Sequence, residues 1–226
     1  MRRGWVLGLV VVAVLGGCTS SPRVTPTTPT TSATPFGLDR LKARVDAAEL
    51  SATRMARLGL PRPVYDSPIE SPSVVAMCDR AISSDGAFRY GRGWTWVNKA
   101  LYYSHFVLGY DAATGAQAVA EYRGRATSCR TYGFSDASGS GTIAIIGPVD
   151  LAAPVGVDEM YSFAEVATQM SPAAHKGERT YLCTAVLGKG QLMAYVRTLG
   201  PTAAVARQRL ADVVPIAAEA LVSAAA

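Results

Sequence analysis

The first eighteen residues constrain the fold most. Their pattern predicts that they are not part of the folded domain and that the rest of the chain folds after export. Two arginines are followed by an apolar run from Trp5 to Leu15, and then by two glycines and Cys18. A basic start, a short apolar segment and small residues at its end are typical of a secretory signal peptide, here residues 1–17. The apolar run is shorter than the roughly 20 residues that span a bilayer, which disfavours a permanent transmembrane anchor.

The end of this segment also predicts a lipid anchor. Its Leu-Gly-Gly-Cys18 sequence resembles the lipobox of bacterial lipoproteins, in which the cysteine is acylated, for instance with palmitate, and becomes the new N-terminus after cleavage. This resemblance implies that lipid on Cys18 holds the mature chain on the extracytoplasmic face of the plasma membrane. No second apolar stretch of spanning length follows, so we expect a tethered domain.

Composition changes twice after the signal peptide. Residues 18–35 are a tract of threonine, proline and serine with almost no apolar side chains, which cannot bury enough surface to fold and is expected to form an extended stalk. Within residues 36–60, apolar side chains recur at helical spacing from Leu38 to Leu58, which predicts an amphipathic helix. Its apolar stripe either docks on the following domain or binds a partner or a lipid surface.

Residues 61–226 are predicted to form one domain of the α+β class, with helices flanking a mainly antiparallel sheet. The first part, 61–72, contains four prolines and is expected to be a linker. The expected elements beyond it are a helix at 73–82, strands at 87–90 and 94–99 around a Gly-Arg-Gly turn, a strand at 101–110, a helix at 111–129, strands at 142–149 and 157–170, a hairpin of 179–187 with 191–199, and a C-terminal helix at 202–223 with Pro215 inside it.

Charge and motifs exclude several classes of function. The formal net charge of +5 falls to about +3 without the two arginines of the signal peptide, and no basic run is interleaved with aromatic residues, so nucleic acid is not an expected partner. The sequence has no Gly-x-Ser-x-Gly, Ser-x-x-Lys, Cys-x-x-Cys or His-Glu-x-x-His motif, so we expect no enzyme, no metal and no cofactor. Asp158, Glu159 and Glu165 are interpreted as the solvated face of a strand.

A cluster of aromatic residues is the candidate for ligand binding. Its members fall within twelve residues and alternate between the two faces of the expected sheet, and they are Trp94, Trp96, Tyr102, Tyr103 and His105. Most of them are expected to pack in the core. Any that line a concave surface could hold an apolar or sugar-like ligand.

Three cysteines follow Cys18, and they are Cys78, Cys129 and Cys183. Export to an oxidising compartment allows disulfide bonds to form. Because three is an odd number, one of these cysteines stays free or pairs outside the chain.

Three local patterns occur in an order that resembles a known family. The first is a short apolar stretch that ends at Cys78, the second is an alanine-rich helix that closes on Ala-Thr-Ser-Cys129, and the third is Tyr-Leu-Cys183 in a hairpin that leads into a terminal helix. Together they are similar to the PknH-type extracellular sensor domain of mycobacterial receptor kinases and actinobacterial lipoproteins. The similarity spans about residues 69–221.

The resemblance implies a twisted antiparallel sheet flanked by helices, two disulfides and a cleft for an unidentified ligand. Cys78 and Cys129 match the first disulfide of the family. The partner of Cys183 would fall at the end of the next strand, where this chain has Arg197-Thr198-Leu199, so Cys183 is expected to be a buried free thiol. The N-terminal amphipathic helix is additional to the family pattern.

Two functions follow as expectations. The first is a non-catalytic, sensor-like ligand-binding domain on a membrane-anchored lipoprotein, which takes up an envelope ligand or presents it to a membrane protein. The alternative is a scaffolding lipoprotein that acts through protein contacts, with the helix between Leu38 and Leu58 as the contact surface.

Overall fold

A single sheet organises the part of the chain that the structure describes. The structure is a computed structural model, and the residues it describes are 37–75, 77–78, 80–98, 101–136, 139–171 and 175–226. The predicted signal peptide, Cys18 and the predicted stalk lie outside these residues.

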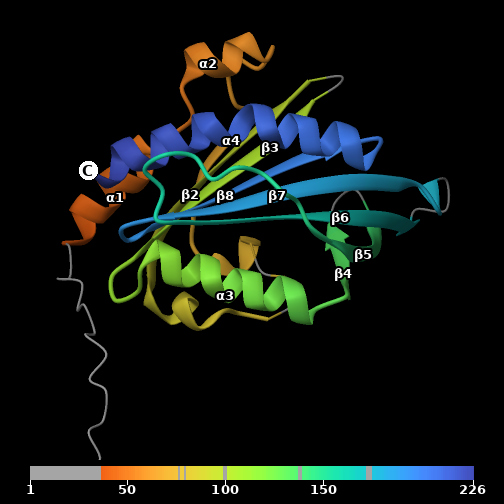
Figure 1. Ribbon diagram of the computed structural model, residues 1–226, viewed down its shortest axis with the longest axis horizontal. Helices are drawn as coiled ribbons and strands as arrows, with labels where there is room; N and C mark the ends of the chain where they lie inside the picture. Colours follow the sequence, from red (N-terminus) through yellow and green to blue (C-terminus); the bar gives the residue numbers. More distant parts are fainter. Residues whose placement is uncertain (1–36, 76, 79, 99–100, 137–138, 172–174) are drawn as a thin grey trace, which may run out of the picture. The chain divides into compact units, whose positions relative to one another are not determined.

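Strands and helices follow one another as predicted for an α+β domain (Figure 1). In chain order they are α1 Leu38–Ala47, α2 Ala52–Arg57, β1 Tyr65–Ile69, the 3-10 helices η1 Pro72–Val75 and η2 Ser83–Ala87, β2 Phe88–Val97, β3 Tyr102–Tyr110, α3 Gly115–Ser128, β4 Thr131–Asp136, β5 Gly139–Pro148, β6 Glu159–Ser171, β7 Arg179–Lys189, β8 Leu192–Gly200 and α4 Ala203–Ala225.

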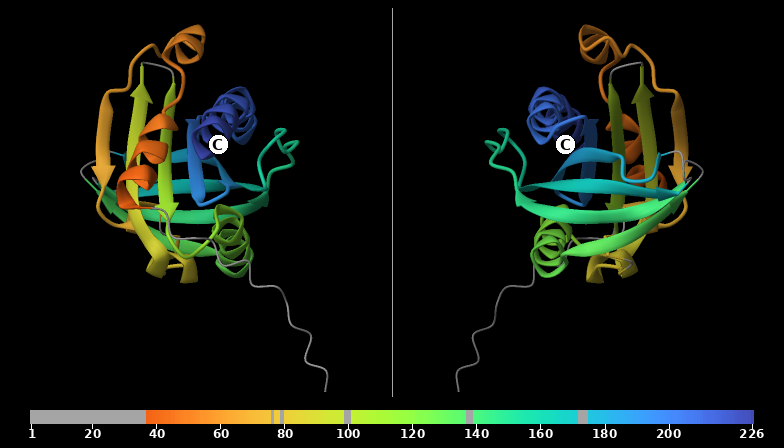
Figure 2. Two further views of the ribbon diagram at one scale, coloured as in Figure 1. Left: turned by 90° about the vertical axis from the view of Figure 1, so that its left-hand side faces the viewer. Right: turned by 90° about the vertical axis from the view of Figure 1, so that its right-hand side faces the viewer.

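The eight strands form one open antiparallel sheet in the order β1-β2-β3-β8-β7-β6-β5-β4. The sheet is strongly twisted and bent, so that β1 to β3 and β4 to β6 are seen at very different angles in Figure 2. The hairpin of β7 and β8 lies in the middle of the sheet, which confirms the hairpin predicted around Gly188 to Gly190.

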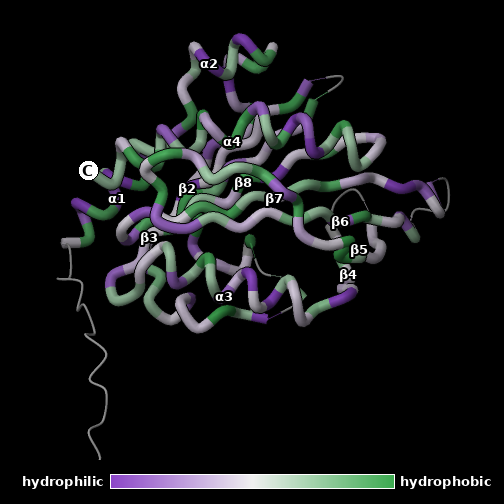
Figure 3. Tube along the Cα trace, in the orientation of Figure 1, coloured by the Kyte–Doolittle hydropathy of each residue, from purple (hydrophilic) through white to green (hydrophobic). Residues whose placement is uncertain are grey.

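Helices pack on both faces of this sheet. Helices α1 and α4 lie on one face and α3 lies on the other, together with η1 and η2 (Figures 1 and 2). Ala194 and Val196 of β8 pack toward α4, whereas Met193 and Tyr195 pack toward α3. Because both faces are covered, β7 and β8 are long hydrophobic stretches instead of alternating ones (Figure 3).

The predicted N-terminal helix is present but broken. Helix α1 ends at Ala47, and α2 begins at Ala52. The break places Leu50 in the core, where its exposed fraction is 2%, whereas one straight helix would direct the exposed Ala52 there instead. The apolar stripe docks on the domain, because Leu41, Val45, Ala48, Leu50 and Met55 all belong to the core beneath α4.

Several elements differ from the sequence prediction. The predicted linker contains β1, an edge strand that tolerates Pro68 because an edge position need not donate a ladder hydrogen bond. Gly91 and Gly93 form no turn but lie inside β2, where a Cβ on Gly93 would come within 2.5 Å of the Phe106 ring. The predicted helix at 73–82 is only the 3-10 turn η1 followed by a bridge between Met77 and Arg80. Strand β4 was not predicted.

Helix α4 runs the length of its face of the sheet. The side chain of Thr202 caps it by accepting a hydrogen bond from the Val205 amide at 3.3 Å. Pro215 lies inside the helix and does not end it. Within the described residues, no helix combines the length and the apolarity needed to cross a membrane.

The cysteines are placed as the resemblance implied. Cys78 and Cys129 form a disulfide, with their Cα atoms 6.4 Å apart, that ties the segment after η1 to the end of α3. Cys183 is a free thiol in β7 with 1% of its surface exposed. Burial raises the pKa of this thiol to about 11, so it is protonated and unreactive at neutral pH.

Loss of the disulfide should destabilise the domain strongly. Replacing both Cys78 and Cys129 by alanine is expected to lower the free energy of unfolding by about 4 kcal/mol, because the bridge constrains a loop of 51 residues in the unfolded chain. Urea unfolding measures the loss. The control Cys183→Ala removes only a small buried side chain and should cost about 1 kcal/mol. Equal losses in the two proteins would contradict the bridge.

His105 should make the domain sensitive to mild acid. Its side chain is fully buried against Trp94, neither ring nitrogen has a hydrogen-bond partner in the described residues, and burial lowers its pKa to about 3. The unfolded chain, with a histidine pKa of about 6.5, therefore binds a proton that the folded chain does not. The free energy of unfolding therefore keeps its full value above about pH 6.5 and should fall by about 1.4 kcal/mol per pH unit between about pH 6.5 and 3.

This contribution can be isolated with a matched pair of variants. His105→Phe keeps a ring against Trp94 but cannot bind a proton. The free energy of unfolding of this variant should therefore depend less on pH below about 6.5. His175→Phe changes the exposed histidine and should leave the pH dependence unchanged. Urea unfolding at several pH values measures both, and an identical slope in wild type and His105→Phe would refute the assignment.

Candidate functional site

One face of the sheet is only partly covered by its helix. Helix α3 packs over Val186 of β7 and Tyr195 of β8. Leu182, four residues before Val186, and Arg197, two residues after Tyr195, lie on the same face of these strands but outside the cluster under α3. They line an open groove instead.

The groove has a volume of about 340 Å³ and crosses six neighbouring strands from β3 to β4. Its lining residues are Tyr102, Phe134, Ile143, Ala167, Gln169, Thr180, Leu182, Arg197 and Leu199. The floor is therefore apolar, with a phenol, a hydroxyl, an amide and a guanidinium at its margins. This combination of shape, size and lining is typical of small-molecule sites.

A second hollow continues the groove at the end of β8. It has a volume of about 390 Å³ and shares Tyr102, Thr180 and Leu199 with the groove. Arg179 and Arg209 also line it. Arg209 donates to the carbonyl of Leu199, Arg179 lies over the Tyr181 ring, and neither forms a salt bridge with another described residue. This end of the groove is therefore positively charged.

A buried polar network marks the boundary between the groove and the core under α3. Glu165 of β6 is fully buried and accepts hydrogen bonds from Arg197 Nη2, at 2.9 Å, and from the hydroxyl of Tyr132. Arg197 Nε donates to Thr184 Oγ1 at 3.2 Å, and the guanidinium lies 5.1 Å from the centre of the Tyr195 ring. The arginine side chain keeps 23% of its surface exposed, toward the groove.

The charges and protonation states of this network indicate that it holds the Arg197 side chain in place. Burial raises the pKa of Tyr132, so its phenol is a neutral donor, and burial raises the pKa of Tyr195 to about 12. Glu165 and Arg197 form a buried ion pair whose charges cancel. Removing either partner would leave the other charge uncompensated. The network therefore fixes Arg197 at the edge of the groove.

The structure separates the aromatic residues that the sequence predicted for ligand binding. Trp94, Trp96, Tyr103 and His105 have exposed fractions of 2% or less and pack in the core under α1 and α4, out of reach of a surface ligand. Tyr102 alone of the five lies in the groove. Strand alternation explains the outcome, because Tyr102 points to the opposite face from its neighbour Tyr103.

The sequence interpretation missed the polar network. The strand pattern predicts a solvated Glu165, but this side chain is fully buried. Asp158 does lie near the surface, where it accepts hydrogen bonds from Lys189 and the Gly190 amide. A signal was present, because Glu165 and Arg197 are single charges within otherwise uncharged stretches of their strands. Opposite charges in two such strands indicate a buried pair.

The acidic and sulfur-containing side chains form no metal centre among the described residues. No group of three or more histidine, cysteine, aspartate or glutamate side chains within them is arranged to hold a metal ion.

The sheet, its helices and the groove define the described part of the chain as an α+β domain with an open groove on one face. No protein family and no curated protein matches the chain in sequence. Its structure is similar to the extracellular domain of PknH from Mycobacterium tuberculosis, with 14% sequence identity and a TM-score of 0.45 over 80% of this chain and 98% of that one.

A second similar structure is an uncharacterized protein from Mycobacterium smegmatis, the Rv0999 ortholog. Here the identity is 11% and the TM-score 0.37, over 76% of this chain and 99% of that one. These values assign no family to the chain.

Breaking the buried ion pair should be costly. Glu165→Gln keeps the shape of the side chain but leaves Arg197 without its counter-charge, so the free energy of unfolding should fall by about 3–5 kcal/mol. Glu159→Gln breaks the exposed pair with Arg123 and should cost less than about 1 kcal/mol. Urea unfolding compares the two variants.

A double variant distinguishes the cost of an unpaired buried charge from the cost of altered packing. Glu165→Leu combined with Arg197→Met replaces both charges by apolar groups and should recover most of the stability lost in Glu165→Gln. If Glu165→Gln costs no more than Glu159→Gln, the pair does not hold the boundary of the groove.

Proposed function

We propose that this chain is a non-catalytic, sensor-like ligand-binding lipoprotein, anchored on the extracytoplasmic face of the plasma membrane by lipid on Cys18. The anchoring rests on the signal peptide and the lipobox-like sequence that ends at Cys18. The binding function rests on one observation, which is the open groove of about 340 Å³ with an apolar floor that α3 leaves uncovered. Its disulfide fits an oxidising compartment.

The chemistry of the groove favours an amphiphile with a negatively charged head. Leu182, Ile143 and Phe134 offer contacts to an apolar part of the ligand. The adjoining hollow presents Arg179 and Arg209, which have no carboxylate partner among the described residues. Arginine forms forked hydrogen bonds with carboxylate and phosphate groups. An envelope lipid with an acidic head group would satisfy both parts.

Scaffolding through the N-terminal helix is less favoured. That function needs the apolar stripe of the helix to be available to a partner. The structure buries Leu41, Val45 and Met55 of this stripe within the domain, each with an exposed fraction of 2% or less. The stripe is therefore already occupied by contacts within the chain.

The ligand can be sought in the protein purified from its own envelope. Native mass spectrometry of the full-length lipoprotein, released from detergent micelles, should show a discrete bound species, and fragmentation should identify it as an acidic amphiphile. Ala167→Trp fills the groove and should remove the bound species, because the indole occupies the space above Leu182 and Ile143.

A control variant adds the same bulk elsewhere. Thr142→Trp places the indole on the opposite face of β5, at an exposed position next to Ile143, and should retain the ligand. If the wild-type chain carries no bound species, the ligand-binding function is contradicted and a function through protein contacts is favoured. A species that persists in Ala167→Trp would place the ligand outside the groove.

A further inference from the structure

Three arginines surround the disulfide, on the face of the sheet that carries α3. Arg80 lies two residues after the bridge residue Cys78, Arg125 lies in the last turn of α3, and Arg130 follows Cys129 directly. All three line a hollow of about 360 Å³, together with Ser128, Thr131 and the two cysteines. The disulfide brings these arginines together, because it joins two segments that are 51 residues apart in the sequence.

None of the three guanidinium groups forms a salt bridge with another described residue. Arg125 Nη2 donates to the carbonyl of Ala81 at 2.8 Å, which holds its side chain over the loop. The described residues that line the hollow include no carboxylate, and Asp79 lies outside the described residues. Like charges brought together in this way repel one another, and a bound anion would relieve that repulsion.

Two described carboxylates line adjoining hollows together with Arg125, and both accept hydrogen bonds from backbone amides. Asp85 accepts a hydrogen bond from the Ile82 amide at 2.9 Å, and Glu121 accepts from the Ser84 amide at 2.8 Å and from Gln117. The C-terminal end of α3 carries a partial negative charge, which favours one nearby cation by up to about 1 kcal/mol. That effect is too small to offset three adjacent positive charges.

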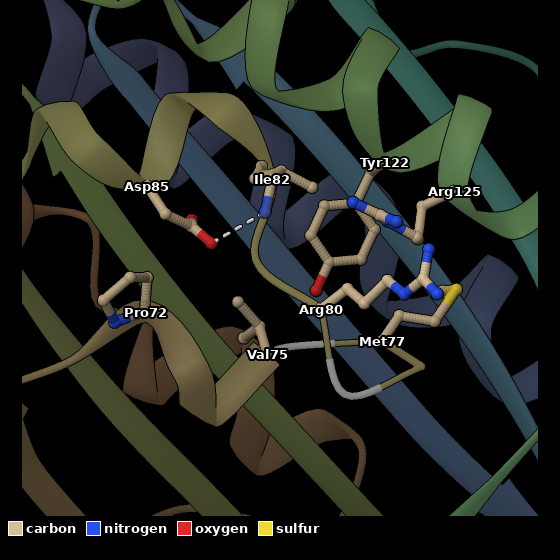
Figure 4. A pocket seen from close by; sticks show the side chains of 8 residues that line it. All are labelled: Pro72, Val75, Met77, Arg80, Ile82, Asp85, Tyr122 and Arg125. Atoms are coloured by element: carbon tan, nitrogen blue, oxygen red, sulfur yellow. Dashed lines mark hydrogen bonds between the residues drawn. The ribbon is translucent and has the colours of Figure 1, made fainter.

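An unpartnered hydroxyl points into the adjoining space. Arg80 and Arg125 also line a small pocket with Tyr122, apolar side chains and the carboxylate of Asp85, which accepts a hydrogen bond from the Ile82 amide (Figure 4). Tyr122 is 2% exposed, and its hydroxyl has no hydrogen-bond partner in the described residues. Figure 4 shows this hydroxyl directed into the pocket beside Arg80. The pocket has a volume of about 10 Å³, enough for one oxygen atom.

We propose that Arg80, Arg125 and Arg130 form a binding site for a phosphate group, with the hydroxyl of Tyr122 as an additional donor to one of its oxygens or to a water bound to it. Phosphate fits because it is small, carries about two negative charges and presents three acceptor oxygens, whereas a carboxylate carries one charge and two oxygens. Ser128 and Thr131 supply hydroxyls at the rim. The volume of the hollow leaves room for a sugar or glycerol unit attached to the phosphate.

This site is separate from the groove of the proposed function. The two share no lining residue, and the hollow is polar where the groove floor is apolar. Binding at the hollow therefore does not depend on the amphiphile, and each site can be tested without the other.

Calorimetric titration of the full-length lipoprotein in non-ionic detergent tests the site. The probes are inorganic phosphate, a hexose phosphate, and glycerophosphoglycerol as a soluble lipid head group, each in a low-salt buffer without phosphate. We expect saturable binding, and the tightest probe distinguishes a free phosphate monoester from a lipid head group as the source. Arg80→Gln and Arg130→Gln should each weaken binding about tenfold, as expected for the loss of a charge-assisted hydrogen bond.

Matched variants keep the test specific. Arg57→Gln removes a positive charge from the exposed end of α2 and should not change the affinity. Tyr122→Phe removes only the hydroxyl and should weaken binding without affecting the fold, which circular dichroism checks. Ala167→Trp should bind phosphate normally, even though its groove is filled. No saturable heat with any probe, or the same affinity in Arg80→Gln, Arg130→Gln and wild type, would overturn the proposal.

Discussion

The burial of both faces of β7 and β8 is the constraint on which the rest of the domain depends. Ala185 and Val196 face α4, and Val186 and Tyr195 face α3, so at their centre both sides of these strands are buried. Each face therefore needs a helical layer. Helices α4 and α3 supply it at the centre, and α1 extends it over β2 and β3. The flanking strands in turn need less cover, and their outer positions are more exposed.

The two candidate sites lie where this cover stops. At one end of β7 and β8, α3 no longer reaches the sheet, and the ion pair of Glu165 and Arg197 separates a dry core from an accessible groove. At the end of α3, the disulfide joins Cys78 to Cys129, and three arginines line the hollow beside it. The two sites have different chemistry because one is built on strands with apolar side chains and the other on the charged residues around the end of α3.

Periodicity in the sequence was sufficient for the central elements and insufficient at the margins. The hairpin of β7 and β8, the strand β3 and the helices α3 and α4 carry strong patterns, and the structure confirms them. Strand β1 contains Pro68, and β2 contains Gly91 and Gly93, so local rules indicate a linker and a turn where long-range pairing makes strands. The groove could not be predicted, because its lining comes from six strands whose order depends on the whole topology.

The aromatic residues show the same limit at the level of single side chains. Alternation predicted that Trp94, Trp96, Tyr102, Tyr103 and His105 would divide between two faces, but it could not say which face would be covered completely. The covered face holds four of them, and the cover is supplied by α1 and α4, which are distant in the sequence. Only the position of α3 decides that Tyr102 stays accessible.

The packing of α1 has a mechanical consequence. The chain enters the domain through α1, which belongs to no strand ladder and is held by side-chain contacts with β2, β3 and α4, and by a hydrogen bond from Arg44 to the carbonyl of the last residue, Ala226. A pulling force applied at residue 37 would therefore load this helix before it loads any backbone hydrogen bond of the sheet. Under tension, α1 would be the first element to separate from β2, β3 and α4, whereas the groove on the opposite face is lined by strands that α1 does not cover.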